Sequence, residues 1–294
     1  MDSGHTAWML TASALVFFMT PGLAFFYGGL VRAKSLVNTI MLSFMTIGVV
    51  SIVWTLWGYS LAYGNGELIE NFIGDFSLLG LDGVAMMSGE EDAISPLYDV
   101  LFQMMFAIIT PALITGAFVE RFKFSTYLIF TVIWITVVYA PVAHWVWGGG
   151  WIGDAGALDF AGGTVIHINA GAAAVAAALL VGKRANPGLQ PNNVPFVVLG
   201  ASILWFGWFG FNGGSALAAD DFAVNAMLVT QIAAGTAATT WGLIGLFATK
   251  KISAVGVATG AVAGLVAITP AAGAVNALGA IAIGLGAGSI CYFA

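Results

Sequence analysis

The stretch DFAGGTVIHINAGAAAVAAALLVGKR, residues 159–184, decides the class of this fold. Between Asp159 and the basic pair Lys183-Arg184 it contains no aspartate, glutamate, lysine or arginine. A transmembrane helix needs about 20 predominantly apolar residues. The stretch therefore predicts a membrane-spanning helix that carries one ionisable side chain, His167, inside the bilayer.

The rest of the chain repeats this pattern. It is 60% hydrophobic and only 7% charged, whereas soluble domains carry about 25% charged residues. We therefore predict an all-α polytopic membrane protein, with one transmembrane domain over residues 1–294. Its nine predicted spans cover approximately residues 7–31, 39–62, 99–119, 125–147, 162–182, 194–214, 223–248, 253–271 and 274–294.

The basic residues predict the orientation of these spans. All eight follow odd-numbered spans, as Arg32, Lys34, Arg121, Lys123, Lys183, Arg184, Lys250 and Lys251. Positive charge marks the cytoplasmic side, so the N-terminus is expected outside a cell (inner or plasma) membrane. An acidic segment then falls outside, where it would attract cations; its residues are Glu67, Glu70, Asp75, Asp82, Glu90, Glu91 and Asp92, with Asp154, Asp220 and Asp221 on the same side.

Two short phrases recur with the same offset in span number. Residues 26–29, FYGG, in span one are echoed by residues 211–214, FNGG, in span six. Residues 109–112, ITPA, in span three are echoed by residues 268–271, ITPA, in span eight. A unit of five spans is odd, so its second copy runs inverted, as in many transporters. The predicted repeats cover about residues 7–182 and, incompletely, 194–294.

His167 is the clearest functional candidate, because ionisable groups inside a membrane are expensive and are usually functional. Gly163, Ala170, Gly171 and Ala174 share its helical face by spacing. Small residues mark faces packed on other helices, which predicts that His167 points into the protein. A structural histidine is the alternative interpretation. Asp159, just before this span, is expected to cap the helix and order the preceding loop.

Aromatic and polar side chains line other predicted spans. One helical face of span six carries Trp208, Phe211, Asn212 and Ser215, and span three carries Gln103, Phe106, Ala107 and Thr110. Span four ends in His144, Trp147 and Trp151. Tryptophans at this depth commonly form an interfacial belt. Together with a serine and an acidic outer face they also suit a small cation, because ring faces attract cations.

The sequence contains no phosphate loop, hydrolytic triad or metal-ligand cluster. The glycine run at residues 148–150 is not followed by a strand–helix unit, which excludes a nucleotide site of the usual kind. We therefore predict no enzyme activity, no cofactor and no nucleic-acid partner. His144 and His5 are interpreted as structural or interfacial.

Four phrases carry a resemblance to a known family. They are PGLAFFYGGLVR at 21–32, AHWVWGGG at 143–150, DFAGGTVIHIN at 159–169 and GWFGFNGGS at 207–215. With them the chain closely resembles the Amt/Mep/Rh ammonium-transporter family, nearer its bacterial Amt branch. The resemblance runs from about Thr20 to the last residue.

The resemblance implies eleven spans in an inverted five-plus-five repeat, and a homotrimer with one pore per subunit. It implies that Trp147 and Ser215 recruit ammonium, with Phe106 in the same wall. Phe106 and Phe211 would stack as a gate below that site. Methylammonium would be a second substrate, and a PII-type regulatory protein would bind the cytoplasmic face.

The resemblance assigns roles to the deeper residues as well. Asp159 would support the recruitment site without contacting the ion. His167 would be the first of two pore histidines that relay protons, and Trp208 and Gln103 would line the path. Ammonium can lose a proton at a cost of about 3 kcal/mol, whereas potassium cannot, so an apolar gate followed by neutral histidines would select ammonium by its chemistry.

One feature departs from the family pattern. The second pore histidine lies on the tenth span of the family, and only nine spans are found here. We therefore expect that the chain is truncated before that span and that a longer reading frame supplies it; a natural short form that completes its pore between subunits is the alternative. For function, an ammonium-sensing membrane module of a signalling protein is the alternative to a transporter.

Overall fold

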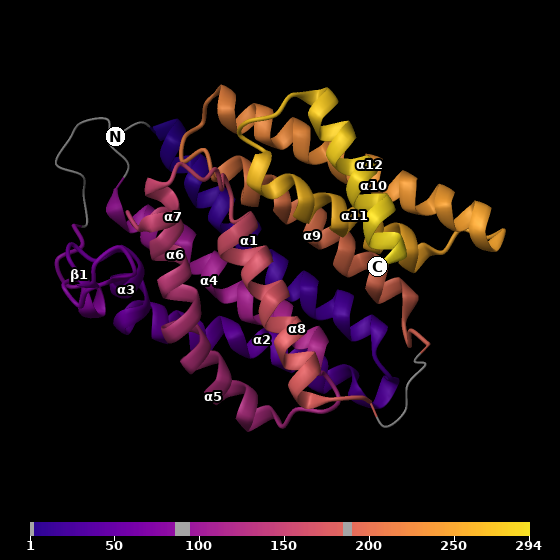
Figure 1. Ribbon diagram of the computed structural model, residues 1–294, viewed down its shortest axis with the longest axis horizontal. Helices are drawn as coiled ribbons and strands as arrows, with labels where there is room; N and C mark the ends of the chain where they lie inside the picture. The colour runs from indigo at the N-terminus through magenta and orange to yellow at the C-terminus, as the bar shows by residue number, and fades with distance from the viewer. Residues whose placement is uncertain (1–2, 86–94, 185–189) are drawn as a thin grey trace. The chain divides into compact units, whose positions relative to one another are not determined.

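The computed structural model describes residues 3–85, 95–184 and 190–294, which are predominantly helical (Figure 1). The α-helices are α1 Ser3–Leu30, α2 Leu36–Val53, α3 Tyr59–Tyr63, α4 Pro96–Phe118, α5 Phe124–Trp134, α6 Ala140–Trp147, α7 Trp151–Asp154, α8 Asn169–Val181, α9 Val194–Gly214, α10 Asp221–Thr249, α11 Ala254–Ile268 and α12 Ala277–Phe293. Shorter helical turns are η1 Ala33–Ser35, η2 Trp54–Gly58, η3 Leu79–Leu81, η4 Ile135–Tyr139, η5 Gly163–Ile168 and η6 Thr269–Ala271. Two strands, β1 Glu67–Ile69 and β2 Ile73–Gly74, pair antiparallel.

The predicted membrane fold is confirmed. Within the described ranges, eight helical stretches are long and apolar enough to cross a membrane: Ser3–Leu30, Ala33–Tyr63, Pro96–Phe118, Phe124–Asp154, Gly163–Val181, Val194–Gly214, Asp221–Thr249 and Ala254–Ala271. The ninth predicted span corresponds to the shorter apolar helix α12. Of the predicted acidic outer segment, Glu90, Glu91 and Asp92 lie outside the described residues.

Local side-chain caps explain where several helices begin. A helix leaves its first backbone N–H groups without partners, and a short polar side chain can accept a bond from one of them. The side chain before the helix does this for α4, α9, α10, α11 and α12; the pairs are Ser95 with Leu97 N, Asn193 with Phe196 N, Asp220 with Ala223 N, Ser253 with Gly256 N, and Asn276 with Gly279 N. The cap at Asn276 starts α12 slightly later than the predicted span.

Three helices contain a π-helical turn, where the backbone hydrogen bonds reach one residue further than in an α-helix. These turns are η2, η4 and η5. Isolated π turns are rare and frequently lie at functional sites. The third begins the helix that carries His167, so the regular helix expected there from the sequence starts only at Asn169.

The chain divides into two compact units, each made of separate segments. Unit 1 comprises Met1–Thr6, Met41–Asp159 and Thr164–Pro187, and unit 2 comprises Ala7–Ile40, Phe160–Gly163 and Gly188–Ala294. The units do not follow the predicted repeats, since most of α1 belongs to unit 2. Repeats are defined by internal symmetry rather than by contacts, so the five-plus-five repeat remains a prediction.

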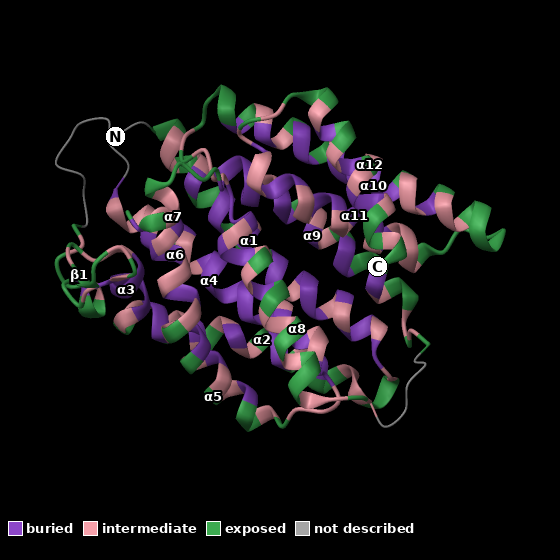
Figure 2. Ribbon diagram, viewed as in Figure 1, coloured by how far each residue is buried: buried purple, intermediate pink, exposed green. Residues whose placement is uncertain are grey.

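Unit 1 has its core around α4, which is buried along most of its length and packs against α8 (Figure 2). The structure describes all of α8, and Ala170 alone among its residues is buried. The small-residue face predicted around His167 is therefore only partly correct. Gly163 and Ala170 are buried, whereas Gly171 is exposed.

In unit 2 the helices α10, α11 and α12 pack closely, as the orange and yellow ribbons of Figure 1 show. The contacts are made at glycines. A Cβ added to Gly264 or to Gly284 would lie 2.6 Å from the carbonyl oxygen of Ala233, and one added to Gly288 would lie 2.7 Å from that of Ala237. Small residues let membrane helices approach closely, which replaces the missing hydrophobic drive between helices in lipid.

The two ITPA phrases have the same local hydrogen bond. The Thr110 hydroxyl donates to the carbonyl of Phe106 at 2.6 Å, and the Thr269 hydroxyl donates to that of Leu265 at 2.8 Å. In both cases the acceptor lies four residues before the threonine, and the threonine stands directly before a proline. The phrases therefore correspond in geometry as well as in letters, although this does not establish the full repeat.

Candidate functional site

In unit 1 the predicted recruitment tryptophan stands at the end of α6. The Trp147 indole N–H donates to the backbone carbonyl of Asp159 at 2.9 Å, which fixes the ring. Its ring packs edge-on with Phe106 of α4, at 6.3 Å between centroids and 78° between planes. Phe106 is only 1% exposed, and its ring centroid lies 4.7 Å from that of Phe102. The structure thus brings Trp147 and Phe106 into contact, as the resemblance implied for one wall.

The glycine run after Trp147 explains why α6 ends there. A Cβ on Gly148 would collide with the carbonyl of Ala62, and Gly149 has φ +88°, a conformation that side chains rarely adopt. The chain can turn at this point only with glycine in both places. The run therefore has a structural role at the end of α6.

Asp159 connects this wall to the helix of His167. Its Oδ2 accepts hydrogen bonds from the backbone N–H of Thr164 at 2.8 Å and of Val165 at 3.1 Å. The cap expected from the sequence is thus confirmed. The same residue holds the Trp147 ring through its backbone carbonyl. One residue therefore orients both the aromatic wall and the π-helical turn η5 in which His167 lies.

In unit 2 the predicted residues lie on α9. The Trp208 and Phe211 rings are 5.2 Å apart, both buried, and the Trp208 indole donates to the Thr269 hydroxyl at 2.9 Å. Ser215 follows the helix, and its hydroxyl donates to the carbonyl of Phe211 at 2.8 Å. Since its one proton is engaged, the Ser215 oxygen is left to accept from another donor. The predicted stacking of Phe106 on Phe211 joins residues of different units and remains a prediction.

Two polar groups near the predicted site, one of them partly exposed, were not predicted from the sequence. Asp99 lies in the first turns of α4, and its carboxylate accepts from the Tyr59 hydroxyl at 2.9 Å and from the Gln103 side chain. The available signal was a carboxylate placed four residues before Gln103 on the same helix. Tyr59 gave no signal, because an aromatic residue near the end of a span usually belongs to the interfacial belt.

His144 has the structural role expected of it. Its ring is 1% exposed; Nδ1 donates to the Ala62 carbonyl at 3.0 Å, and Nε2 lies 3.2 Å from Glu67 Oε1. A second bond joins the turn between β1 and β2 to α6, because the Trp145 indole donates to the Phe72 carbonyl at 2.8 Å. These contacts attach the outer hairpin to the helix end that carries Trp147.

The Glu67 contact predicts a pH dependence. The backbone N–H of Asn71, and then His144, hold the pKa of the Glu67 carboxyl below its ordinary value. A lowered pKa stabilises the folded hairpin above the ordinary pKa of glutamate, and this stabilisation is lost as pH falls through the folded pKa. Amide protection in peptides covering residues 67–74, measured relative to intrinsic exchange at each pH, should therefore fall more steeply on acidification in the unaltered protein than in Glu67→Gln. Glu70→Gln, in the same hairpin, is the control, and equal acid profiles for all three proteins would contradict the prediction.

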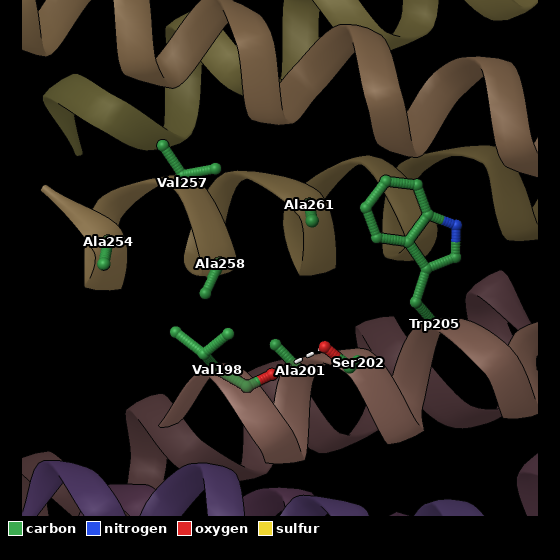
Figure 3. A pocket seen from close by; sticks show the side chains of 8 residues that line it. All are labelled: Val198, Ala201, Ser202, Trp205, Ala254, Val257, Ala258 and Ala261. Carbon is green, nitrogen blue, oxygen red and sulfur yellow. Dashed lines mark hydrogen bonds between the residues drawn. The ribbon is translucent and has the colours of Figure 1, made fainter. Parts of the chain in front are cut away.

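A separate groove on unit 2 lies between α9 and α11 (Figure 3). It has a volume of about 310 Å³ and is lined by Val198, Ala201, Ser202, Trp205, Ala254, Val257, Ala258 and Ala261. The Ser202 hydroxyl donates to the Val198 carbonyl at 2.9 Å, and the Trp205 indole donates to Gln231 Oε1 at 3.0 Å. Its two polar side chains are thus engaged within the protein, and its remaining lining is aliphatic, so we do not assign it to an ion site.

Comparison with known proteins shows which sequences this chain resembles. The sequence profile described as Ammonium Transporter Family matches residues 7–294. An ammonium transporter of Aquifex aeolicus is 53% identical over 298 residues, covering 100% of this chain and 69% of the relative. Ammonium transporter Amt1 of Archaeoglobus fulgidus is 48% identical, covering 100% of this chain and 73% of the relative.

Solved structures show the same relationship. The crystal structure of Candida albicans Mep2 superposes with a TM-score of 0.93 at 40% identity, covering 100% of this chain and 66% of Mep2. A structure described as a sensor Amt protein superposes with a TM-score of 0.91 at 31% identity, covering 99% of this chain and 74% of that protein. The chain therefore spans about two thirds to three quarters of the length of these relatives. On the profile match, the sequence identity and the shared fold, this chain belongs to the ammonium transporter family.

Proposed function

We propose that this protein moves ammonium across a membrane. The observation that carries the proposal is the aromatic wall of Trp147 and Phe106, held in place by the backbone of Asp159. Because the Trp147 N–H is engaged by that backbone, the ring can meet a guest only with its face or edge. An aromatic face attracts a cation by about 0.5–2 kcal/mol, which suits recruitment of NH₄⁺.

Ser215 would complete the recruitment site. Its hydroxyl proton is engaged by Phe211, so its oxygen would accept an N–H bond from the ion. Phe106 and Phe211 would then form the gate through which the ion passes. Both rings are nearly fully buried, and a bare charge in such apolar surroundings is very costly. Ammonium would avoid that cost by leaving its proton behind and passing as ammonia.

His167 would take part in the relay of that proton. It is the ionisable residue of the η5–α8 span, and imidazole can accept and donate protons near physiological pH. Trp208 and Gln103 would line the path. Asp159 would support the recruitment site without touching the ion, since its carboxylate is engaged by the backbone of Thr164 and Val165.

Orientation and assembly follow from the same proposal. The basic residues would face the cytoplasm of a cell membrane, with the N-terminus outside. The protein would act as a homotrimer with one pore in each subunit, transport methylammonium as well as ammonium, and bind a PII-type regulatory protein on its cytoplasmic face. Sensing of ammonium is the second candidate function, and it is supported by the similarity to a structure described as a sensor Amt protein.

Trp147→Leu tests the proposal. Leucine removes the aromatic face but keeps an apolar side chain, so the apparent affinity for ammonium should fall about three- to tenfold, and discrimination against potassium should weaken. Ammonium-dependent current and methylammonium uptake in proteoliposomes measure both quantities. A sensor that does not transport would give no current even unaltered.

The control is Trp151→Leu, which changes an exposed tryptophan of α7 that we assign to the interface. Equal losses in the two variants would mean that Trp147 is also an interfacial residue. Unchanged selectivity of Trp147→Leu would remove this residue from the site.

A further inference from the structure

The mechanism above does not use the carboxylate of Asp99. Asp99 and Gln103 lie four residues apart on α4, and so share one face of that helix. The Asp99 carboxylate accepts a hydrogen bond from the Tyr59 hydroxyl at 2.9 Å and another from the Gln103 side chain. All three residues belong to unit 1.

These bonds determine which end of the Gln103 amide points where. Asp99 accepts this bond from Gln103, and the only donor of a glutamine side chain is its NH₂ group, so Gln103 presents that group to Asp99. The carbonyl oxygen Oε1 then points away from Asp99. It is buried, and it has no hydrogen-bond partner among the residues that the structure describes. Buried acceptors without a partner are rare in native proteins.

The position of that acceptor is informative. Gln103 stands one turn before Phe106 on α4, so the two side chains share one face of the helix. The Phe106 ring on that face packs with Trp147. A carbonyl oxygen with no partner among the described residues, placed at this depth, can accept a hydrogen bond from any N–H donor that passes Phe106. With the amide turned round, the same place would offer an NH₂ group, which cannot accept from ammonium.

Aromatic packing holds the third member in place. The Tyr59 ring lies 5.8 Å from that of Trp54 and 5.2 Å from that of Tyr63. Trp54 is fully buried, and its indole donates to the Val100 carbonyl at 3.2 Å. The Tyr59 hydroxyl therefore has little freedom to leave Asp99, and the carboxylate is held between two donors.

We propose that Asp99, held by Tyr59, is a positioning residue that orients the Gln103 amide so that its carbonyl oxygen faces the N–H donors of the transported species. The inference rests on the proposed transport function. Asp99 itself touches no substrate. Its effect passes through the amide of Gln103.

Asp99→Asn is the first test. Asparagine has the same shape as aspartate, but its side chain can both donate and accept hydrogen bonds. It can therefore bind either the NH₂ group or the carbonyl oxygen of Gln103, and the amide is no longer held in one orientation. We expect KM for methylammonium uptake in proteoliposomes to rise about fivefold, with a smaller change in maximal rate. Tyr59→Phe removes a single hydroxyl and should raise KM in the same direction but less. Glu120→Gln, the same carboxyl-to-amide change at a residue just after the end of α4 and outside the acidic outer segment, should leave KM unchanged.

A double-mutant cycle separates positioning from a structural role. In a Gln103→Leu background there is no amide to orient, so Asp99→Asn should no longer change KM. An equal effect of Asp99→Asn in both backgrounds, or no effect in the unaltered background, overturns the inference. Thermal unfolding in detergent shows whether each variant is folded. If Asp99→Asn does not fold, Tyr59→Phe replaces it in the double-mutant cycle. If the unaltered protein shows no uptake at all, it is the proposed function that fails.

Discussion

Replacing Gly284 with alanine is expected to destabilise the protein by about 1–3 kcal/mol, against the ordinary preference of helices. Alanine normally stabilises a helix interior relative to glycine by about 1 kcal/mol. At Gly284, however, the new Cβ would lie 2.6 Å from the carbonyl oxygen of Ala233 and 2.7 Å from the Cβ of Thr236. The backbone of α10 cannot give way locally, so α12 would have to move away from it.

Gly286 provides the matched control on the same helix. A Cβ at Gly286 meets nothing within 4 Å, so Gly286→Ala should be neutral or slightly stabilising. Thermal unfolding in detergent, followed by circular dichroism, compares the two variants with the unaltered protein. If the two substitutions shift the midpoint equally, close packing of α12 on α10 is not what these glycines provide.

Asp159→Ala is expected to have the larger functional effect, with uptake falling at least about tenfold. The substitution leaves the N–H groups of Thr164 and Val165 without their acceptor, and an unsatisfied buried donor costs about 1–3 kcal/mol. The start of η5 would then move, and His167 with it. Because the Asp159 backbone also holds Trp147, the disturbance would reach both parts of the unit 1 site.

Asp154→Ala, at the exposed end of α7, is the control for loss of an acidic residue on the same side. Asp159→Asn adds a finer comparison, since its amide oxygen can still accept while its NH₂ cannot. We expect it to retain more uptake than Asp159→Ala in proteoliposomes. Full activity of Asp159→Ala would show that the cap is dispensable and that its carboxylate does not organise the site.

The sequence predicted the spans well because hydrophobicity and length are properties of a continuous segment. It also predicted the cap at Asp159, since a cap and its helix are adjacent in the chain. The π-helical turn at His167 could not be predicted from spacing, because the pattern there suits an α-helix equally well. The contact of Tyr59 with Asp99 joins residues 40 positions apart. No local pattern reports such a pairing.

The small-residue face of the η5–α8 span shows the limit of composition as a guide. Gly171 and Ala170 are adjacent and both small, yet Gly171 is exposed and Ala170 is buried. Small residues permit close packing, but they do not specify which neighbour is present. The roles of Phe106 with Phe211 depend in turn on the arrangement of the two units, and they remain predictions that the transport experiments address.

In the proposed recruitment site, the engaged hydroxyl of Ser215 would have a consequence for the choice among ammonium ions. Because its proton already goes to the Phe211 carbonyl, the oxygen can only receive hydrogens, and a guest must bring them. Each methyl group on nitrogen removes one N–H while leaving the positive charge unchanged. Along the series from ammonium to tetramethylammonium, attraction to the tryptophan ring would persist while the bond to Ser215 becomes less available and finally vanishes. Ser215 would therefore distinguish these ions by the number of hydrogens on nitrogen and not by their charge.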